Sequence, residues 1–176
     1  MTRVGAIMED LRKHINLVDD IENGTLYHLS KRDDIEKLTP MVPRKVASRN
    51  NAFEDDIIKR VSFAPSIEGC ILGLQLSTDD FVNGEVMLNV YEPLNIHKKH
   101  LVSNETIVSK KLVFDADITK ECWYLREVEV DNVGSITVYD KVDRIIEYTP
   151  IRVGDPKFIK PNGKLDTYLY EWEWNG

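Results

Sequence analysis

Short strand-like runs separated by turn residues make up most of this 176-residue sequence, and they constrain its fold more than any other feature. These runs are rich in β-branched and aromatic residues, which favour extended backbone. Loops join most of them, so we expect mixed or antiparallel sheets rather than a doubly wound parallel sheet. The predicted strands cover residues 25–30, 57–64, 82–91, 121–130, 135–139 and 166–174.

Two segments have the apolar spacing of a helix. The first covers about residues 5–18, and we expect this N-terminal helix, within residues 1–20, to pack on the rest of the chain. The second covers residues 67–76, with Pro65-Ser66 at its start. The expected fold is therefore a single α+β domain over residues 1–176, with one or two helices and either a mixed or antiparallel sheet or two small sheets.

Two long connections carry little regular pattern. Residues 31–56 contain two prolines, a polar run and one weak helical candidate at residues 33–37. A connection of this length is often functional, so it is the candidate for a lid or a binding loop. Residues 94–118 show one short apolar stretch, and residues 132–134 are expected to form a turn between two strands.

Charge and composition argue against several classes of protein. The net charge is −7 and the basic residues are dispersed, which does not favour nucleic-acid binding. No apolar run approaches the roughly 18 residues of a membrane span, and the N-terminus turns acidic before a signal-peptide core could form. We therefore expect a cytoplasmic protein without membrane contact. Cys70 and Cys122 are expected to be reduced, partly buried residues.

His28 is the first candidate site residue. It lies within a predicted strand, on the opposite face from Tyr27 and Leu29. An imidazole placed there can hydrogen-bond a ribose hydroxyl or act as a base near neutral pH. The alternative is a structural histidine whose ring nitrogens are satisfied by the backbone.

The segment Arg60–Ser66 supplies further candidates, because it is a strand that runs directly into a helix. A helix N-terminus offers unpaired amides and a partial positive charge. Ser62 and Ser66 would donate to an anion or an amide oxygen, and Arg60 would hold a phosphate. Ser66 also suits a plain capping role, and a cap can face a ligand.

Five segments within about residues 25–130 form a further pattern: Tyr27–Ser30, Leu38–Pro40 with Pro43, Arg60–Cys70, Val90–Pro93 and Thr119–Trp123. This pattern resembles a family of uncharacterised phage and prophage proteins of Gram-positive bacteria. The resemblance implies a source, with the host cytoplasm as the location.

A more distant resemblance is to the ADP-ribosyltransferase-like fold, and it is carried by His28 and by Ser62 ahead of a helix. It implies that NAD binds in a cleft between two small sheets, beside His28, Arg60, Ser62 and Ser66. It also implies a glutamate that steadies the oxocarbenium ion developing at the ribose. Glu121, at the start of a predicted strand, is one candidate, and Glu171-Trp172-Glu173 has the E-x-E spacing of some members of that group. With Glu121 in this role, His28 and Glu121 are the expected catalytic residues.

The expected function is binding of NAD or a related nucleotide, with ADP-ribosyl transfer as its possible chemistry. One alternative is a non-catalytic protein that binds a host protein, as an inhibitor or in host takeover. The net charge and the alternating aromatic run of residues 168–174 suit that alternative. Another is a structural or morphogenetic phage protein that forms a homo-oligomer.

The sequence does not predict a metal site. His97 and His100 have a spacing of three residues, but the two lysines between them would repel a cation. The segment His97–His100 is instead interpreted as a solvated loop that could touch an acidic partner.

Overall fold

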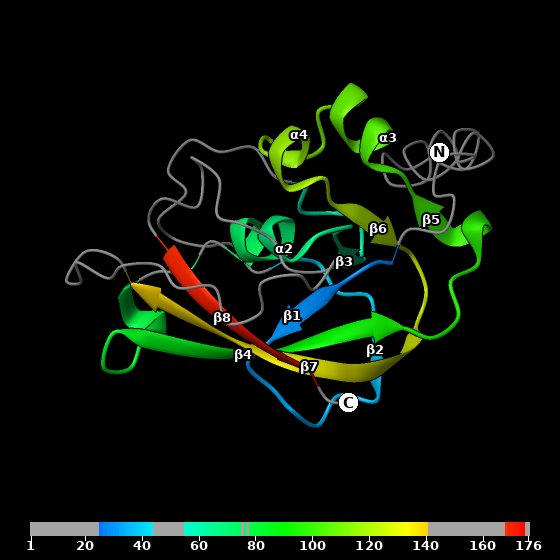
Figure 1. Cartoon of the computed structure of the whole chain (residues 1–176). Coiled ribbons are helices and arrows are strands. Elements are labelled where there is room, and N and C mark those ends of the chain that lie inside the picture. The colour runs from blue at the N-terminus through cyan, green and yellow to red at the C-terminus, as the bar shows by residue number, and fades with distance from the viewer. Residues whose placement is uncertain (1–24, 44–54, 75, 77, 141–167, 175–176) are drawn as a thin grey trace.

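The computed structural model describes residues 25–43, 55–74, 76, 78–140 and 168–174. Its fold is α+β, with two small antiparallel sheets and short helices. Figure 1 shows the larger sheet below and the smaller sheet above it, beside the helices. The predicted N-terminal helix lies outside the described residues. None of the described helices is long and apolar enough to cross a membrane.

The larger sheet is organised around β4 and β7, which pair along the whole length of β4. The strand order is β1-β4-β7-β2, and β8 also pairs with β7. Strands β2 and β8 pair with opposite ends of β7. Strand β2 pairs near Glu129, and β8 pairs from Gly134 onward. The strands are β1 His28–Ser30, β2 Lys37–Leu38, β4 Glu85–Pro93, β7 Val128–Asp140 and β8 Tyr168–Trp174.

The smaller sheet has the order β3-β6-β5, and short helices surround it. Its strands are β3 Val61–Phe63, β5 Leu101–Val102 and β6 Cys122–Tyr124. The α-helices are α2 Ile67–Leu74, α3 Asn104–Ser109 and α4 Ala116–Thr119, and the 3-10 helices are η1 Thr78–Asp80 and η2 Lys98–His100.

A β-bulge divides β7 into two parts. Val90 of β4 pairs with Gly134, and the next residue pairs with Asn132, which leaves Val133 as an extra residue in β7. An extra residue reverses the face toward which the following alternate side chains point. The two parts of β7 therefore bury their side chains against different partners.

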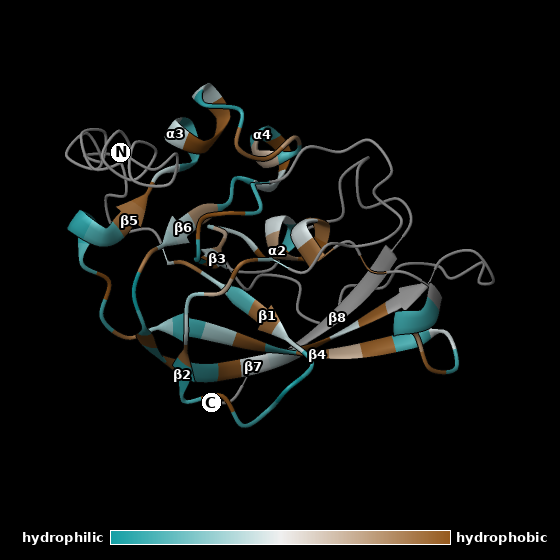
Figure 2. Ribbon diagram, turned by 180° about the vertical axis from the view of Figure 1, so that it is seen from behind, coloured by the Kyte–Doolittle hydropathy of each residue, from teal (hydrophilic) through white to brown (hydrophobic). Residues whose placement is uncertain are grey.

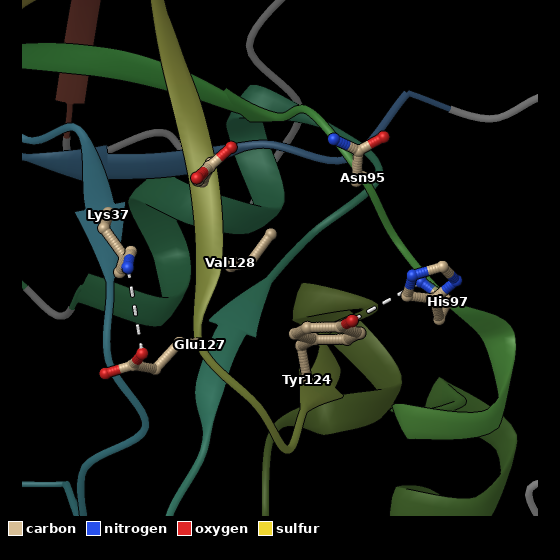
Figure 3. A pocket seen from close by; sticks show the side chains of 7 residues that line it. Lys37, Asn95, His97, Tyr124, Glu127 and Val128 are labelled. Carbon is tan, nitrogen blue, oxygen red and sulfur yellow. Dashed lines mark hydrogen bonds and ion pairs between the residues drawn. The ribbon is translucent and has the colours of Figure 1, made fainter.

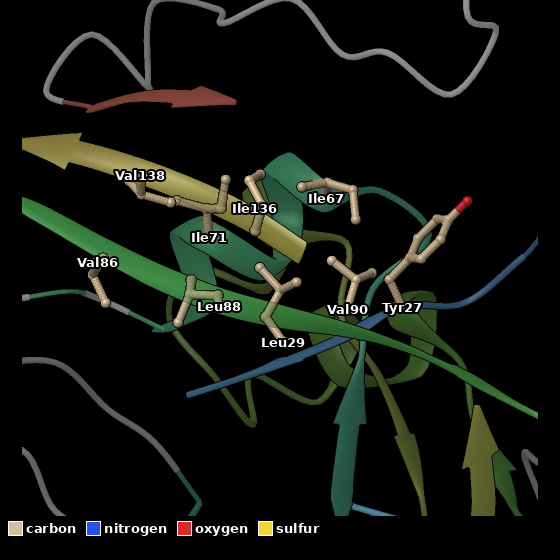
Figure 4. Packing of buried hydrophobic residues seen from close by; sticks show 9 residues of the cluster. All are labelled: Tyr27, Leu29, Ile67, Ile71, Val86, Leu88, Val90, Ile136 and Val138. Atoms are coloured by element: carbon tan, nitrogen blue, oxygen red, sulfur yellow. The ribbon is translucent and has the colours of Figure 1, made fainter. Parts of the chain in front are cut away.

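Three hydrophobic cores result from this arrangement. In the first, Ile67 and Ile71 of α2 pack on the larger sheet, whose strands show alternating hydropathy (Figures 2 and 4). The second lies between the two sheets and contains Leu26, Val61, Phe63, Tyr91, Leu101, Cys122, Tyr124, Val128 and Val130. Trp123 points to the other face of the smaller sheet and packs there in the third core, with residues of α3 and α4.

Several predicted elements are confirmed. Helix α2 begins directly after Pro65-Ser66, and β4 follows a turn at Asn83-Gly84, where both residues have positive φ. Strand β4 ends at Pro93, and a strand occupies residues 168–174, as the sequence predicts.

Other predictions of local structure are wrong. The single strand predicted over residues 121–130 is two strands of different sheets, separated by residues 125–127. The turn predicted at residues 132–134 lies inside β7, because the turn-like residues there form the bulge. No helix forms at residues 33–37, where β2 begins instead. The connection of residues 94–118 contains β5, α3 and the start of α4, which are too short to show a periodic pattern.

Candidate functional site

The outer edge of β3 joins the two sheets. Arg60 exchanges both backbone hydrogen bonds with Met41, at N–O distances of 3.0 Å. Ala64 does the same with Tyr27, at 2.8 and 3.0 Å. Ser62 lies midway between these two bridges. Every second residue of a strand directs its backbone N–H and C=O groups to the same side, so Ser62 directs its own groups to this edge.

The side chain of His28 completes this edge. Its Nδ1 lies 3.0 Å from the carbonyl oxygen of Ser62, which is the residue between the two bridges. Because a carbonyl only accepts, Nδ1 carries the ring proton and Nε2 is an acceptor. The ring meets Phe63 edge-on, with centroids 6.0 Å apart. The structure thus places His28 and Ser62 side by side, through the backbone of Ser62.

The position of His28 predicts sensitivity to acid. Burial lowers the pKa of His28 below its ordinary 6.5, and the hydrogen bond to Ser62 opposes that shift. Stability that depends on the neutral ring is therefore present above pH 6.5 and is lost as the pH falls through the folded-state pKa. We expect urea unfolding to show a steeper loss of stability from about pH 7 to pH 5 in the wild type than in His28→Asn, which keeps a donor but does not titrate. Equal slopes would contradict this role.

Ser66 caps helix α2. Its Oγ accepts a hydrogen bond from the backbone N–H of Gly69 at 3.1 Å, as an N-cap serine does. In the same helix, the Cys70 thiol donates to the carbonyl oxygen of Tyr27 at 3.2 Å. Burial raises the pKa of Cys70 to about 12, so this thiol stays protonated and unreactive near neutral pH.

Arg60 is buried in the third core. Its guanidinium lies 3.9 Å from the centroid of the Trp123 ring, in a cation–π contact. Nη1 donates to the backbone carbonyls of Asp55 and Ile58, at 3.0 and 3.2 Å, and to the Asp55 carboxylate at 3.3 Å. These contacts fix the loop before β3. They also occupy the Arg60 guanidinium, which the sequence predicts to hold a phosphate.

Glu121 contacts the smaller sheet. Its Oε1 accepts a hydrogen bond from the indole N–H of Trp123 at 2.5 Å. Its backbone carbonyl accepts from the side chain of Asn104 at 3.1 Å. The carboxylate expected to act at a ribose is thus held by the indole of a third-core residue.

A pocket opens elsewhere, at the mouth between the two sheets, and has a volume of about 300 Å³. In Figure 3, Lys37 and Glu127 lie on one side of it, and Asn95 and His97 lie on the other. Tyr124 of the smaller sheet and Val128 of the larger sheet are buried and form its floor, and Glu129 completes the lining. None of the five sequence-predicted site residues lines it.

The pocket walls are polar and exposed. Lys37 Nζ lies 3.9 Å from the Glu127 carboxylate, which also accepts from the Thr39 hydroxyl at 3.3 Å. On the opposite wall, the Tyr124 hydroxyl accepts from the backbone N–H of His97 at 3.4 Å. A small apolar contact at Val128, with a lysine, an amide and carboxylates around it, suits a small polar ligand.

A cluster of basic side chains adjoins this pocket, and we call it the basic rim: His97, Lys98, Lys99, His100 and Arg126. The backbone N–H of Leu125 donates to the carbonyl of His100 at 3.0 Å and holds the two segments together. Burial lowers the pKa of His100, and the charges of Lys99, Arg126 and His97 lower it further. Within the described part of the chain, no cluster of His, Cys, Asp and Glu suited to a metal ion occurs.

The sequence does not reveal the pocket, because four separate segments supply its residues. Only His97 stands out in the sequence, where it is interpreted as part of a solvated loop. No protein-family model, no curated protein and no solved structure matches the chain.

Proposed function

We propose that this chain binds NAD or a related nucleotide in the pocket between the two sheets. The observation that carries the proposal is the pocket's construction, with a buried floor and polar walls drawn from both sheets. Ligand pockets span about 300–1,000 Å³, so a pocket of this size takes the nucleoside end of a nucleotide and leaves the rest at the mouth. The adjoining basic rim supplies positive charge at that mouth.

Each wall offers a group that suits one part of such a ligand. The Asn95 amide can pair with a carboxamide or a base edge, because it both donates and accepts. The carboxylates of Glu127 and Glu129 can accept from ribose hydroxyls, and they favour a cationic nicotinamide ring. Val128 is 4% exposed at the base of the pocket and offers a small apolar contact to the ligand.

ADP-ribosyl transfer would be the chemistry of this site if the chain is an enzyme. In that reaction the bond between the nicotinamide nitrogen and the ribose carbon breaks, nicotinamide leaves with the electron pair, and a nucleophile of a target protein bonds to the carbon. A carboxylate stabilises the positive charge that develops at the ribose. Glu129 lines the pocket and is better placed for this role than Glu121, so nicotinamide release in wild type but not in Glu129→Gln would support it.

Filling the pocket is expected to abolish binding. Asn95 is exposed in a loop, so Asn95→Trp places an indole in the cavity with little effect on the fold. We expect calorimetric titration with NAD to show at least about a tenfold loss of affinity, since a blocked pocket forfeits about 1.4 kcal/mol or more.

The matched control is Val108→Trp, which adds the same bulk at an exposed position on α3, outside the pocket lining. This variant should bind NAD as the wild type does. Absence of heat with the wild-type protein, or equal affinity in Asn95→Trp, would count against nucleotide binding in this pocket.

A further inference from the structure

The basic rim concentrates positive charge in an acidic protein. The chain has a net charge of −7, yet two lysines and an arginine gather with two histidines beside one pocket. Their segments are fixed to each other by the Leu125–His100 backbone hydrogen bond and to the pocket floor by the His97–Tyr124 hydrogen bond. The ring of His100 also meets Tyr124 edge-on, with centroids 6.2 Å apart.

Acidic side chains of the described residues do not neutralise the two lysines and the arginine of the rim. Within the same part of the chain, Lys98, Lys99 and Arg126 take part in none of the ion pairs, which instead join Lys31 to Asp80, Arg32 to Asp34, Lys37 to Glu127 and Arg60 to Asp55. Like charges held together without partners repel one another. Burial is the main reason why the pKa of His100 is lowered, and repulsion by the neighbouring charges is the second. An anion with several charges would relieve this repulsion.

We propose that the basic rim binds the phosphates of the ligand, and that the ligand class is therefore nucleoside diphosphate esters rather than nucleosides. The inference rests on the proposed function, because the pocket takes the nucleoside and the rim takes the pyrophosphate. Lysine and arginine side chains are the usual partners of phosphate oxygens. Screening by salt should weaken this contribution, since the rim is exposed.

Calorimetry with inorganic pyrophosphate, ADP-ribose and adenosine tests the rim directly. We expect ADP-ribose to bind the wild-type protein at least tenfold more tightly than adenosine, and pyrophosphate to bind measurably by itself. Lys98→Gln/Lys99→Gln should lose pyrophosphate binding and most of the preference for ADP-ribose. The control Lys59→Gln/Lys111→Gln removes the same charge at two exposed positions outside the rim and should behave as the wild type.

The outcomes separate the two proposals. Pyrophosphate binding that requires Lys98 and Lys99, without any effect of Asn95→Trp on ADP-ribose, would support the rim and contradict the nucleoside pocket. Equal affinity for ADP-ribose and adenosine, unchanged in the double lysine variant, would overturn the rim and leave the pocket standing. A single-stranded oligonucleotide that displaces pyrophosphate at lower concentration than ADP-ribose would overturn the assignment to nucleotides.

Discussion

Arg60→Met is expected to destabilise the protein by about 3–5 kcal/mol, because it leaves a buried carboxylate without its partner. Arg60 and Asp55 are 4% and 6% exposed, and the guanidinium covers the Trp123 ring in the third core. Removing one member of a buried ion pair costs far more than removing both. Urea unfolding near neutral pH measures the loss.

The double variant Asp55→Asn/Arg60→Met should recover most of that stability. The asparagine oxygen can still accept from the backbone N–H of Ile58, which now donates to the Asp55 carboxylate at 2.7 Å. If the free energy of unfolding of Arg60→Met lies within about 1 kcal/mol of the wild-type value, the Arg60–Asp55 pair does not stabilise the fold as proposed. A folded Arg60→Met protein should also bind NAD normally, because Arg60 does not line the pocket.

Gly69→Ala is expected to destabilise the protein by about 3 kcal/mol or more. A Cβ at Gly69 would lie 2.2 Å from the backbone carbonyl oxygen of Thr119, so α2 and α4 would have to move apart. That movement would disturb the N-terminal turn of α2, where Ser66 caps the helix. Thermal or urea unfolding should report the loss directly.

Gly73→Ala provides the matched control in the same helix. A Cβ there would meet its nearest atom, the Thr119 methyl group, at 4.0 Å, which is ordinary contact. Because alanine is favoured over glycine in helices, this variant should gain about 0.5–1 kcal/mol. A loss of stability in Gly69→Ala together with a gain in Gly73→Ala would establish the close approach of α2 and α4. Equal changes in stability would refute it.

Local signals explain what the sequence predicts correctly. Helix α2 follows a proline and a capping serine, and β4 lies between an Asn-Gly turn and a proline, so neighbouring residues define both elements. The α+β class with two small antiparallel sheets likewise follows from strands joined by loops. The sequence predicts that His28 and Ser62 lie side by side around a ligand, whereas in the structure the His28 ring contacts the backbone carbonyl of Ser62.

Non-local geometry explains what the sequence does not predict. The bulge at Val133 depends on how β7 pairs with β4, and its residues resemble a turn when they are taken alone. The pocket likewise forms only when Lys37 of β2 meets Tyr124 of β6 and the segments near Asn95 and Glu127. Such residues carry no shared spacing in the sequence, so periodicity cannot identify them.

The most direct test of nucleotide binding between the sheets is the location of the ligand on the folded protein. Backbone ¹H–¹⁵N spectra, recorded while NAD or ADP-ribose is added, report which amides change their surroundings. We predict that the largest shifts occur at residues 37, 95–100 and 124–129, around the pocket and the basic rim. Shifts confined to residues 28–30 and 62–66, or no shifts at saturating ligand, would contradict this location.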